Sequence, residues 1–202
     1  MRYFVIASIL ASISVARADD TKPVAMTTVK DLADVCKRLV ADLDPKATCT
    51  SAGKLAVKGG VEAETYVAKG GMVRYAVVVT ANKVMYLSPP VEIMPMNCGM
   101  SKCDVLDDNK TTLRTLTINN VSIPALVIDK KFHHEVTNEK GKQDTTEKWT
   151  STSVIACSGS AKGGPACSVR EWGGRGNSCK VTVKPDGNVL SNCDATDYIA
   201  VE

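Results

Sequence analysis

Three methionines and two cysteines lie close together near the middle of the chain, at Met94, Met96, Cys98, Met100 and Cys103. Thioether and thiolate sulfur atoms are soft ligands, and a set of this kind suits Cu(I). The other interpretation is that the two cysteines are oxidised to each other and that the methionines fill gaps beneath the loop. Because the spacing of soft ligands is weak evidence, we assign no metal ligand and no cofactor. A Cu(I)-binding protein that uses this loop is the alternative function.

The two histidines, His133 and His134, are adjacent, and Glu135 follows them. If residues 125–136 form a strand, neighbouring side chains project from opposite faces of the sheet, so the two imidazoles cannot bind one ion together. A zinc site normally needs three or four convergent ligands. We therefore expect structural or incidental roles for both histidines.

Patterns for covalent catalysis are incomplete in this chain. The Gly-x-Ser-x-Gly elbow of serine hydrolases does not occur. Ser51 and Lys54 match a Ser-x-x-Lys pattern, but they open an expected strand, and no Lys-Thr-Gly follows. A cysteine nucleophile is disfavoured because all eight cysteines can pair. We assign no catalytic residue and do not expect an enzyme. An exported hydrolase is the third hypothesis, and a histidine in a pocket beside a serine and a carboxylate would support it.

Two loops carry incomplete ion-binding patterns. Asp107 and Asn109 imitate the start of a calcium loop, but Thr112 occupies the position that requires glycine. Residues 173–177, Gly-Gly-Arg-Gly-Asn, could form a nest of backbone N–H groups for an anion. They lack the helix start and the Lys-Ser/Thr of a phosphate loop. We therefore expect a solvated acidic turn and a flexible hairpin connection.

The first 18 residues have the layout of a secretory signal peptide. Residues 5–16 form an apolar run behind Arg2, and residues 16–18, Ala-Arg-Ala, provide a cleavage site. The run is too short to span a bilayer. We predict removal of residues 1–18 and a mature exported domain of residues 19–202, either extracellular or periplasmic.

Two glycosylation sequons begin at Asn109 and Asn120. They matter only where the host glycosylates exported proteins.

An exported chain meets an oxidising environment, so its eight cysteines are expected to form a disulfide framework. Pairing of near neighbours joins Cys36 to Cys49, Cys98 to Cys103, Cys157 to Cys167 and Cys179 to Cys193. The last pair has support from a hairpin. Counting back in steps of two from a turn at residues 184–187 places Val181 opposite Ser191 and Cys179 opposite Cys193. Opposed cysteines on paired strands lie within disulfide distance.

Apart from one helix, the sequence pattern indicates β-structure. Thr28 and Asp31 form an approximate capping box, and apolar residues at helical spacing follow until the break before Pro45. Stretches rich in β-branched residues, separated by glycine and asparagine turns, then predict strands. These cover residues 54–58, 72–80, 84–87, 112–118, 125–136, 145–157, 168–172, 179–183 and 188–193, with residues 61–68 assigned to a strand in preference to two helical turns. Residues 89–110 are expected to be irregular and are a candidate sub-boundary.

Charge and aromatic content exclude some classes of partner. Of 25 basic residues, Arg2 and Arg17 would leave with the signal peptide, so the mature chain is nearly neutral against its 22 acidic residues. Such a surface disfavours electrostatic capture of nucleic acid or anionic lipid. Aromatic residues make up 4% of the chain, too few for sugar-stacking or single-strand nucleic-acid platforms. We expect no nucleic-acid partner and no membrane span.

The sequence as a whole predicts an α+β protein dominated by β-structure. An N-terminal helix would pack on or beside an antiparallel sheet or meander, and local disulfides would hold turns and hairpins. We expect an exported, non-catalytic protein that binds an unknown protein or surface partner or contributes to a surface layer. The expected contact surfaces are the loops at residues 97–103, 158–166 and 173–178, because loops closed by disulfides are ordered before binding.

Overall fold

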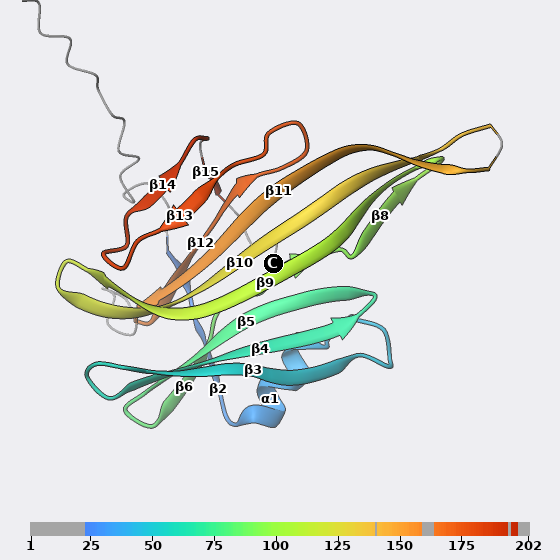
Figure 1. Ribbon diagram of the computed structural model, residues 1–202. Coiled ribbons are helices and arrows are strands. Elements are labelled where there is room, and N and C mark those ends of the chain that lie inside the picture. The colour runs from blue at the N-terminus through green and yellow to red at the C-terminus, as the bar shows by residue number, and fades with distance from the viewer. Residues whose placement is uncertain (1–22, 140, 159–163, 194, 198–202) are drawn as a thin grey trace, which may run out of the picture.

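In the computed structural model of this chain, the described residues are 23–139, 141–158, 164–193 and 195–197. The signal peptide predicted at residues 1–18 lies outside them and stays a prediction. The described residues form one short helix and many strands (Figure 1). The elements are β1 Val24–Ala25, β2 Thr27–Val29, α1 Leu32–Leu39, β3 Thr48–Val57, β4 Val61–Gly70, β5 Met72–Ala81, β6 Val84–Leu87, β7 Val91–Ile93, β8 Met96–Gly99, β9 Lys102–Ile118, β10 Val121–Thr137, β11 Gln143–Ser158, β12 Ala166–Gly173, β13 Val181–Val183, β14 Val189–Ser191 and β15 Ala195–Asp197.

The strands build two large sheets and a separate hairpin of β13 and β14. The larger sheet has seven strands, in the order β1-β12-β11-β10-β9-β8, with β15 beside β12. The smaller sheet has six strands, in the order β2-β6-β5-β4-β3, with β7 beside β5. The paired strands of the described residues run antiparallel. The prediction of a β-dominated protein with antiparallel sheets is therefore confirmed.

The two sheets face each other and bury the main core between them (Figure 1). The larger sheet contributes Ile128 and Ile155, and the smaller sheet contributes Val77 and Val79. Because side chains alternate across a strand, the residues between these positions point away from this core and need a second cover. Helix α1 covers the outer face of the smaller sheet, and the β13–β14 hairpin covers the outer face of the larger sheet (Figure 1).

The helix is shorter than its pattern predicts. It begins after Asp31, whose extended backbone and side chain form the N-cap, with Oδ1 accepting a bond of 2.8 Å from the Asp34 backbone N–H. The expected cap, Thr28, lies in β2 and pairs with Tyr86 of β6. The residues that the capping pattern assigned to the helix start therefore form a strand instead. The prediction of an N-terminal helix is only roughly correct. None of the helices in the described residues is long and apolar enough to cross a membrane.

The segment expected to be irregular, residues 89–110, consists mostly of strands β7, β8 and the first part of β9. The acidic turn expected around Asp107 and Asn109 is wrong, because residues 104–109 belong to β9 and pair with β10, with a register shift that leaves Asp107 without an opposite residue. Their polar side chains find partners there: Asp104 contacts His134, and Asp108 lies 3.7 Å from the ammonium of Lys131. The chain passes from the smaller to the larger sheet between β7 and β8, and both sheets contribute to one core.

The larger sheet is much longer than the smaller one. Strands β9 and β10 have 17 residues each and β11 has 16, whereas β3, β4 and β5 have 10 each. At roughly 3.3 Å per residue, the long strands extend for about 55 Å and the short ones for about 33 Å. One end of the larger sheet, with β8 at its edge, therefore overhangs the smaller sheet (Figure 1). We call this part, which includes residues 96–105, 133–137 and 143–148, the overhang.

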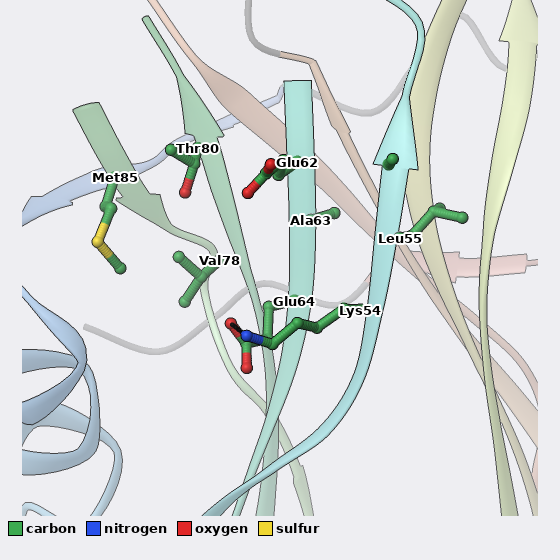
Figure 2. A pocket seen from close by; sticks show the side chains of 9 residues that line it. Lys54, Leu55, Glu62, Ala63, Glu64, Val78, Thr80 and Met85 are labelled. Atoms are coloured by element: carbon green, nitrogen blue, oxygen red, sulfur yellow. Dashed lines mark ion pairs between the residues drawn. The ribbon is translucent and has the colours of Figure 1, made fainter. Parts of the chain in front are cut away.

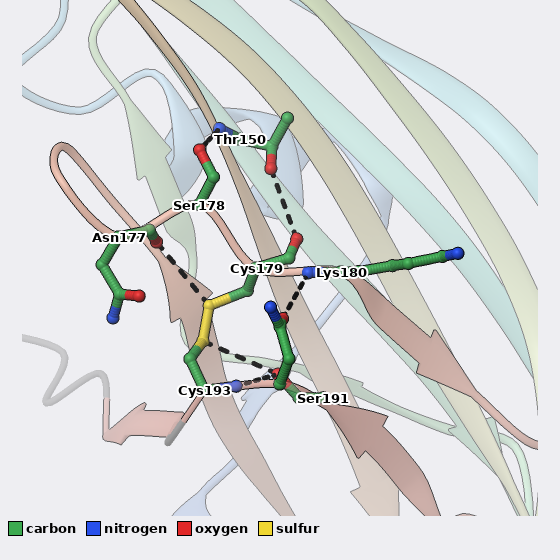
Figure 3. Close-up of a disulfide and its surroundings, with 8 residues drawn as sticks. Thr150, Asn177, Ser178, Cys179, Lys180, Ser191 and Cys193 are labelled. Carbon is green, nitrogen blue, oxygen red and sulfur yellow. Dashed lines mark hydrogen bonds between the residues drawn. A yellow bond between two sulfur atoms is a disulfide. The ribbon is translucent and has the colours of Figure 1, made fainter.

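Four disulfides hold short loops closed. They are Cys36–Cys49, Cys98–Cys103, Cys157–Cys167 and Cys179–Cys193, the near-neighbour pairs. Strand β13 pairs with β14 in the predicted register, with Val181 opposite Ser191. Figure 3 shows how Thr150 of β11 ties the Cys179–Cys193 hairpin to the larger sheet through hydrogen bonds with Ser178 and with the Cys179 carbonyl. The Cys179–Cys193 bridge joins cysteines 14 residues apart, and a disulfide that closes a loop of this length contributes about 3 kcal/mol to stability in the chain-entropy description.

Candidate functional site

Two of the three expected contact loops meet at the overhang. A cavity of about 280 Å³ lies between them. Its lining consists of Asn97, Cys98, Gly99, Lys102, Asp104, His134 and Arg175. The first four belong to the β8–β9 hairpin, and Arg175 comes from the loop after β12. The third expected loop follows Ser158, at the opposite end of β11, and residues 159–163 lie outside the described residues.

His134 and Asp104 form a paired group in this cavity. The side chain of His134 is 4% exposed, and its Nδ1 lies 2.6 Å from Oδ1 of Asp104. A carboxylate only accepts hydrogen bonds at neutral pH, so this contact favours the tautomer with the proton on Nδ1. Within the described residues, Nε2 of His134 makes no hydrogen bond. The ring is thus oriented by Asp104 and keeps one nitrogen available to a ligand.

Arg175 is held in place by Glu147 of β11. The Arg175 Nε donates a bond of 3.1 Å to Oε2 of Glu147, and the Gly176 backbone N–H donates one of 2.9 Å to Oε1. The Nη1 atom of Arg175 lies 3.7 Å from Oδ1 of Asp104. The glycine-rich loop therefore does bind an anion, but the anion is the protein's own carboxylate. These contacts hold the loop against β11.

Two other residues of the cavity keep their donors free. Lys102 and Asn97 are both exposed. Neither side chain forms an ion pair or a hydrogen bond with the described part of the protein. With Lys102, Arg175 and Asp104 as its charged groups, the lining carries one net positive charge while His134 is neutral.

His133 makes different contacts from those of its neighbour. Its Nδ1 lies 2.5 Å from Oδ1 of Asp107, and its Nε2 lies 2.7 Å from Oε1 of Glu135. The hydrogen bond to Glu135, helped by Asp107, raises the pKa of His133, because both carboxylates favour the charged imidazolium. Both ring nitrogens are occupied, so His133 has none left for a metal. The described residues contain no group of three His, Cys, Asp or Glu side chains arranged to hold a metal ion.

The methionines of the β8–β9 hairpin are exposed rather than packed beneath it. Met96 is 57% exposed, Met94 is similarly accessible and Met100 is fully exposed at the hairpin turn. The expectation that methionines fill gaps under the loop is therefore wrong. Cys98 and Cys103 are joined, which removes both thiolates as ligands. The extended strand also spaces the backbone positions of these methionines, since Met96 and Gly99 lie about 10 Å apart at roughly 3.3 Å per residue, and Met100 follows Gly99 in the turn.

A second hollow, of about 260 Å³, lies on the outer face of the smaller sheet beside α1 (Figure 2). The helix is too short to cover this part of the sheet, which leaves Val78 and Met85 at its floor. Lys54 and Glu64 form an ion pair of 3.4 Å across it. The pKa of the neighbouring Tyr66 rises to about 12 because the hydroxyl is buried and Glu64 is close. None of the described residues in the three loops that we expected to be contact surfaces lines this hollow, so we do not treat it as the main site.

The hydrolase arrangement is only partly present. His134 lies in a cavity beside a carboxylate, as that hypothesis requires, but no serine is among the described residues that line the cavity. Ser51 and Lys54, the Ser-x-x-Lys pair, lie in strand β3, and Lys54 is paired with Glu64. Neither position contributes to the cavity at the overhang.

Sequence patterns indicated the two loops but missed most of the side chains that act together. Glu147 carried no signal, since it is a single acidic residue in a polar strand. Lys102 and Asp104 lay in the segment expected to be irregular. The only sequence signal for Arg175 was its place as the single cation of the glycine-rich loop at residues 173–177. No protein-family model, curated protein or solved structure matches this chain.

Proposed function

We propose that this chain is an exported, non-catalytic binding protein and that the overhang is its contact surface for a protein partner. The observation that carries the proposal is the meeting of the 97–103 hairpin and the 173–178 loop around one cavity. These loops are 70 residues apart in the sequence. Exposed loops on a rigid scaffold are where binding proteins usually carry their contacts.

Both loops are ordered before any partner arrives. The Cys98–Cys103 disulfide closes the hairpin, and Glu147 holds the Arg175 loop. Because an ordered loop loses little conformational entropy on binding, such surfaces bind more tightly for the same contact area. The exposed side chains of Met94, Met96 and Met100 add flexible apolar contacts that can adapt to a partner.

Strand β8 offers a second mode of contact. It is the last strand in the order of the larger sheet, so its outer edge has no strand partner within the described residues. An unpaired edge can accept an extended segment of another protein by β-strand addition. We propose that a partner strand pairs here while its apolar side chains contact the methionines.

Four disulfides are compatible with an oxidising environment. The extracellular or periplasmic location belongs to the proposal, and it rests on these disulfides together with the predicted signal peptide.

Site-specific photocrosslinking in cells that export the protein tests the contact surface. A photoreactive amino acid at Met96, which is 57% exposed, should give adducts with a distinct protein. An excess of the unmodified protein should compete for these adducts, whereas an excess of the Met96→Lys variant should not. The matched control is the same photoreactive group at Leu190, which is 53% exposed on the β13–β14 hairpin. Absence of adducts at Met96, or the same adducts at both positions, would contradict the proposal.

The alternative function, binding of a soft metal ion, is favoured only by the exposure of the three thioethers. Replacement of Met94, Met96 and Met100 together by leucine tests it by Cu(I) titration. Unchanged Cu(I) affinity in the triple variant would remove this alternative, and a loss of binding would support it.

A further inference from the structure

We propose that the cavity at the overhang binds an oxyanion, a phosphate or carboxylate group, between Lys102, Asn97 and Arg175 and beside His134. The inference deepens the proposed function, and rests on it, by naming the chemistry that this part of the contact surface recognises. It concerns the cavity alone and not the methionines or the edge of β8.

The hydrogen-bond donors of the cavity support the proposal. The ammonium of Lys102 and the amide of Asn97 have no partner in the described residues. Arg175 uses Nε for Glu147 and Nη1 for Asp104, so its Nη2 stays available. Three donor groups from two separate segments, the β8–β9 hairpin and the Arg175 loop, therefore line one cavity without a bound acceptor. A phosphate or carboxylate group supplies the acceptors that such donors require.

The carboxylates of the site argue against a cation as the ligand. Asp104 already contacts both His134 and Arg175. Glu147 is engaged by Arg175 and by the Gly176 backbone N–H. Each acidic group is already engaged by a cation or an N–H donor. A metal ion would therefore have to displace existing partners, whereas an anion would meet the unpaired ammonium of Lys102.

His134 lies beside these donors and reports on the cavity. Its side chain is 4% exposed, and its orientation is set by Asp104. The anion itself is bound by the ammonium of Lys102, the amide of Asn97 and the guanidinium of Arg175. Charge-assisted hydrogen bonds of this kind are shorter and stronger than neutral ones. The anion can come from two sources, a free small molecule or an acidic group on the protein partner.

The two histidines allow a direct test on the whole protein. In protein labelled with ¹⁵N-histidine, each ring gives separate ¹⁵N signals, and His133→Gln assigns them. Inorganic phosphate, acetate and a tetraglutamate peptide are added at fixed pH, with sodium chloride at matched ionic strength as the reference. We expect one of the three probes to shift the signals of His134 and leave those of His133 in place, since His133 has both nitrogens occupied.

Two lysine variants make the test specific. Lys102→Gln should weaken the binding about tenfold or more, because it removes a charge-assisted hydrogen bond. Lys142→Gln is the matched control, since Lys142 is an exposed lysine in the β10–β11 turn that pairs with Asp144. Lys102 is exposed and unpaired, so its replacement leaves the fold intact.

The outcomes separate the ligand sources and the two proposals. Tighter binding of phosphate or acetate than of the peptide indicates a free small anion, and tighter binding of the peptide indicates an acidic group on a partner. If no probe shifts His134 more than chloride does, or if Lys102→Gln binds as tightly as the unmodified protein, the oxyanion proposal is wrong. Adducts at Met96 in the crosslinking experiment would still stand in that case, so failure of the oxyanion site does not remove the proposed function.

Discussion

The ammonium of Lys130 lies 2.5 Å from Oε1 of Glu171, and both residues belong to strands of the larger sheet. Ser153 accepts a second bond of 2.9 Å from the same ammonium. The three residues come from β10, β12 and β11, so the interaction crosses the middle strand of the three. A buried charge is tolerated only when it is paired and hydrogen-bonded, and Lys130 meets both conditions.

Removal of Lys130 is therefore expected to be costly. Lys130→Ala leaves Glu171 without its cation, and we expect the free energy of unfolding to fall by about 3 kcal/mol, the low end for buried pairs. The low end applies because Glu171 keeps 23% of its side chain exposed. Urea unfolding followed by tryptophan fluorescence measures the loss. The control is Lys130→Met with Glu171→Leu, which removes both charges and should cost much less. Equal losses in the single and double variants would show that the charge pair is not the cause.

His133 is expected to make stability depend on pH. Its pKa is raised in the folded protein by Glu135 and Asp107, whereas in the unfolded chain it is near its ordinary value of 6.5. The stabilisation is therefore complete below the unfolded pKa and is lost as the pH rises through the folded pKa. Urea unfolding across this pH range should show a fall in the unfolding free energy for the unmodified protein. The fall should be absent in His133→Gln, and the same fall in that variant would show that other groups cause it.

Gly173 is expected to be essential for the position of the Arg175 loop. Its φ is +88°, and a Cβ atom would clash with the carbonyl oxygen of Thr150. Gly173→Ala combines a left-handed backbone with this clash, so we expect a loss of about 3 kcal/mol in unfolding free energy. Gly176→Ala is the control in the same loop, since its φ is +73° but a Cβ would meet open space. We expect a loss of about 1 kcal/mol there, from the backbone alone. Similar losses in both variants would contradict the role of the clash.

The two sequons are expected to differ when the protein is secreted by a host that glycosylates. The Asn109 side chain is partly buried and donates a hydrogen bond of 2.5 Å to the Tyr75 hydroxyl of the other sheet. Asn120 is exposed in the β9–β10 turn, with a φ of +63°. A glycan on Asn109 would break the contact between the sheets, so only Asn120 should be modified. Glycopeptide mass spectrometry checks this prediction, and a glycan on Asn109 in folded protein would contradict it.

Local sequence signals were enough for much of the β-structure. Asn119 and Asn120 both have positive φ values in the turn between β9 and β10, where an Asn-Asn pair had indicated a turn. The register of β13 with β14 followed from the turn around residues 184–187, because a hairpin pairs residues that are close in the sequence. The Val61–Gly70 strand was also anticipated. In each case the interacting residues lie within a short segment, so composition and turn chemistry decide the result.

The tertiary structure decided the features that depend on distant segments. Strand β2 exists because residues 27–29 pair with β6, and this pairing moves the helix start from Thr28 to Asp31. The acidic residues 104–109 form a strand because β10 supplies their partners. The cavity exists because two loops 70 residues apart in the sequence reach the same end of the larger sheet. Such contacts depend on how the sheets assemble, and no local pattern carries that information, whereas turns and hairpins are encoded by the few residues that form them.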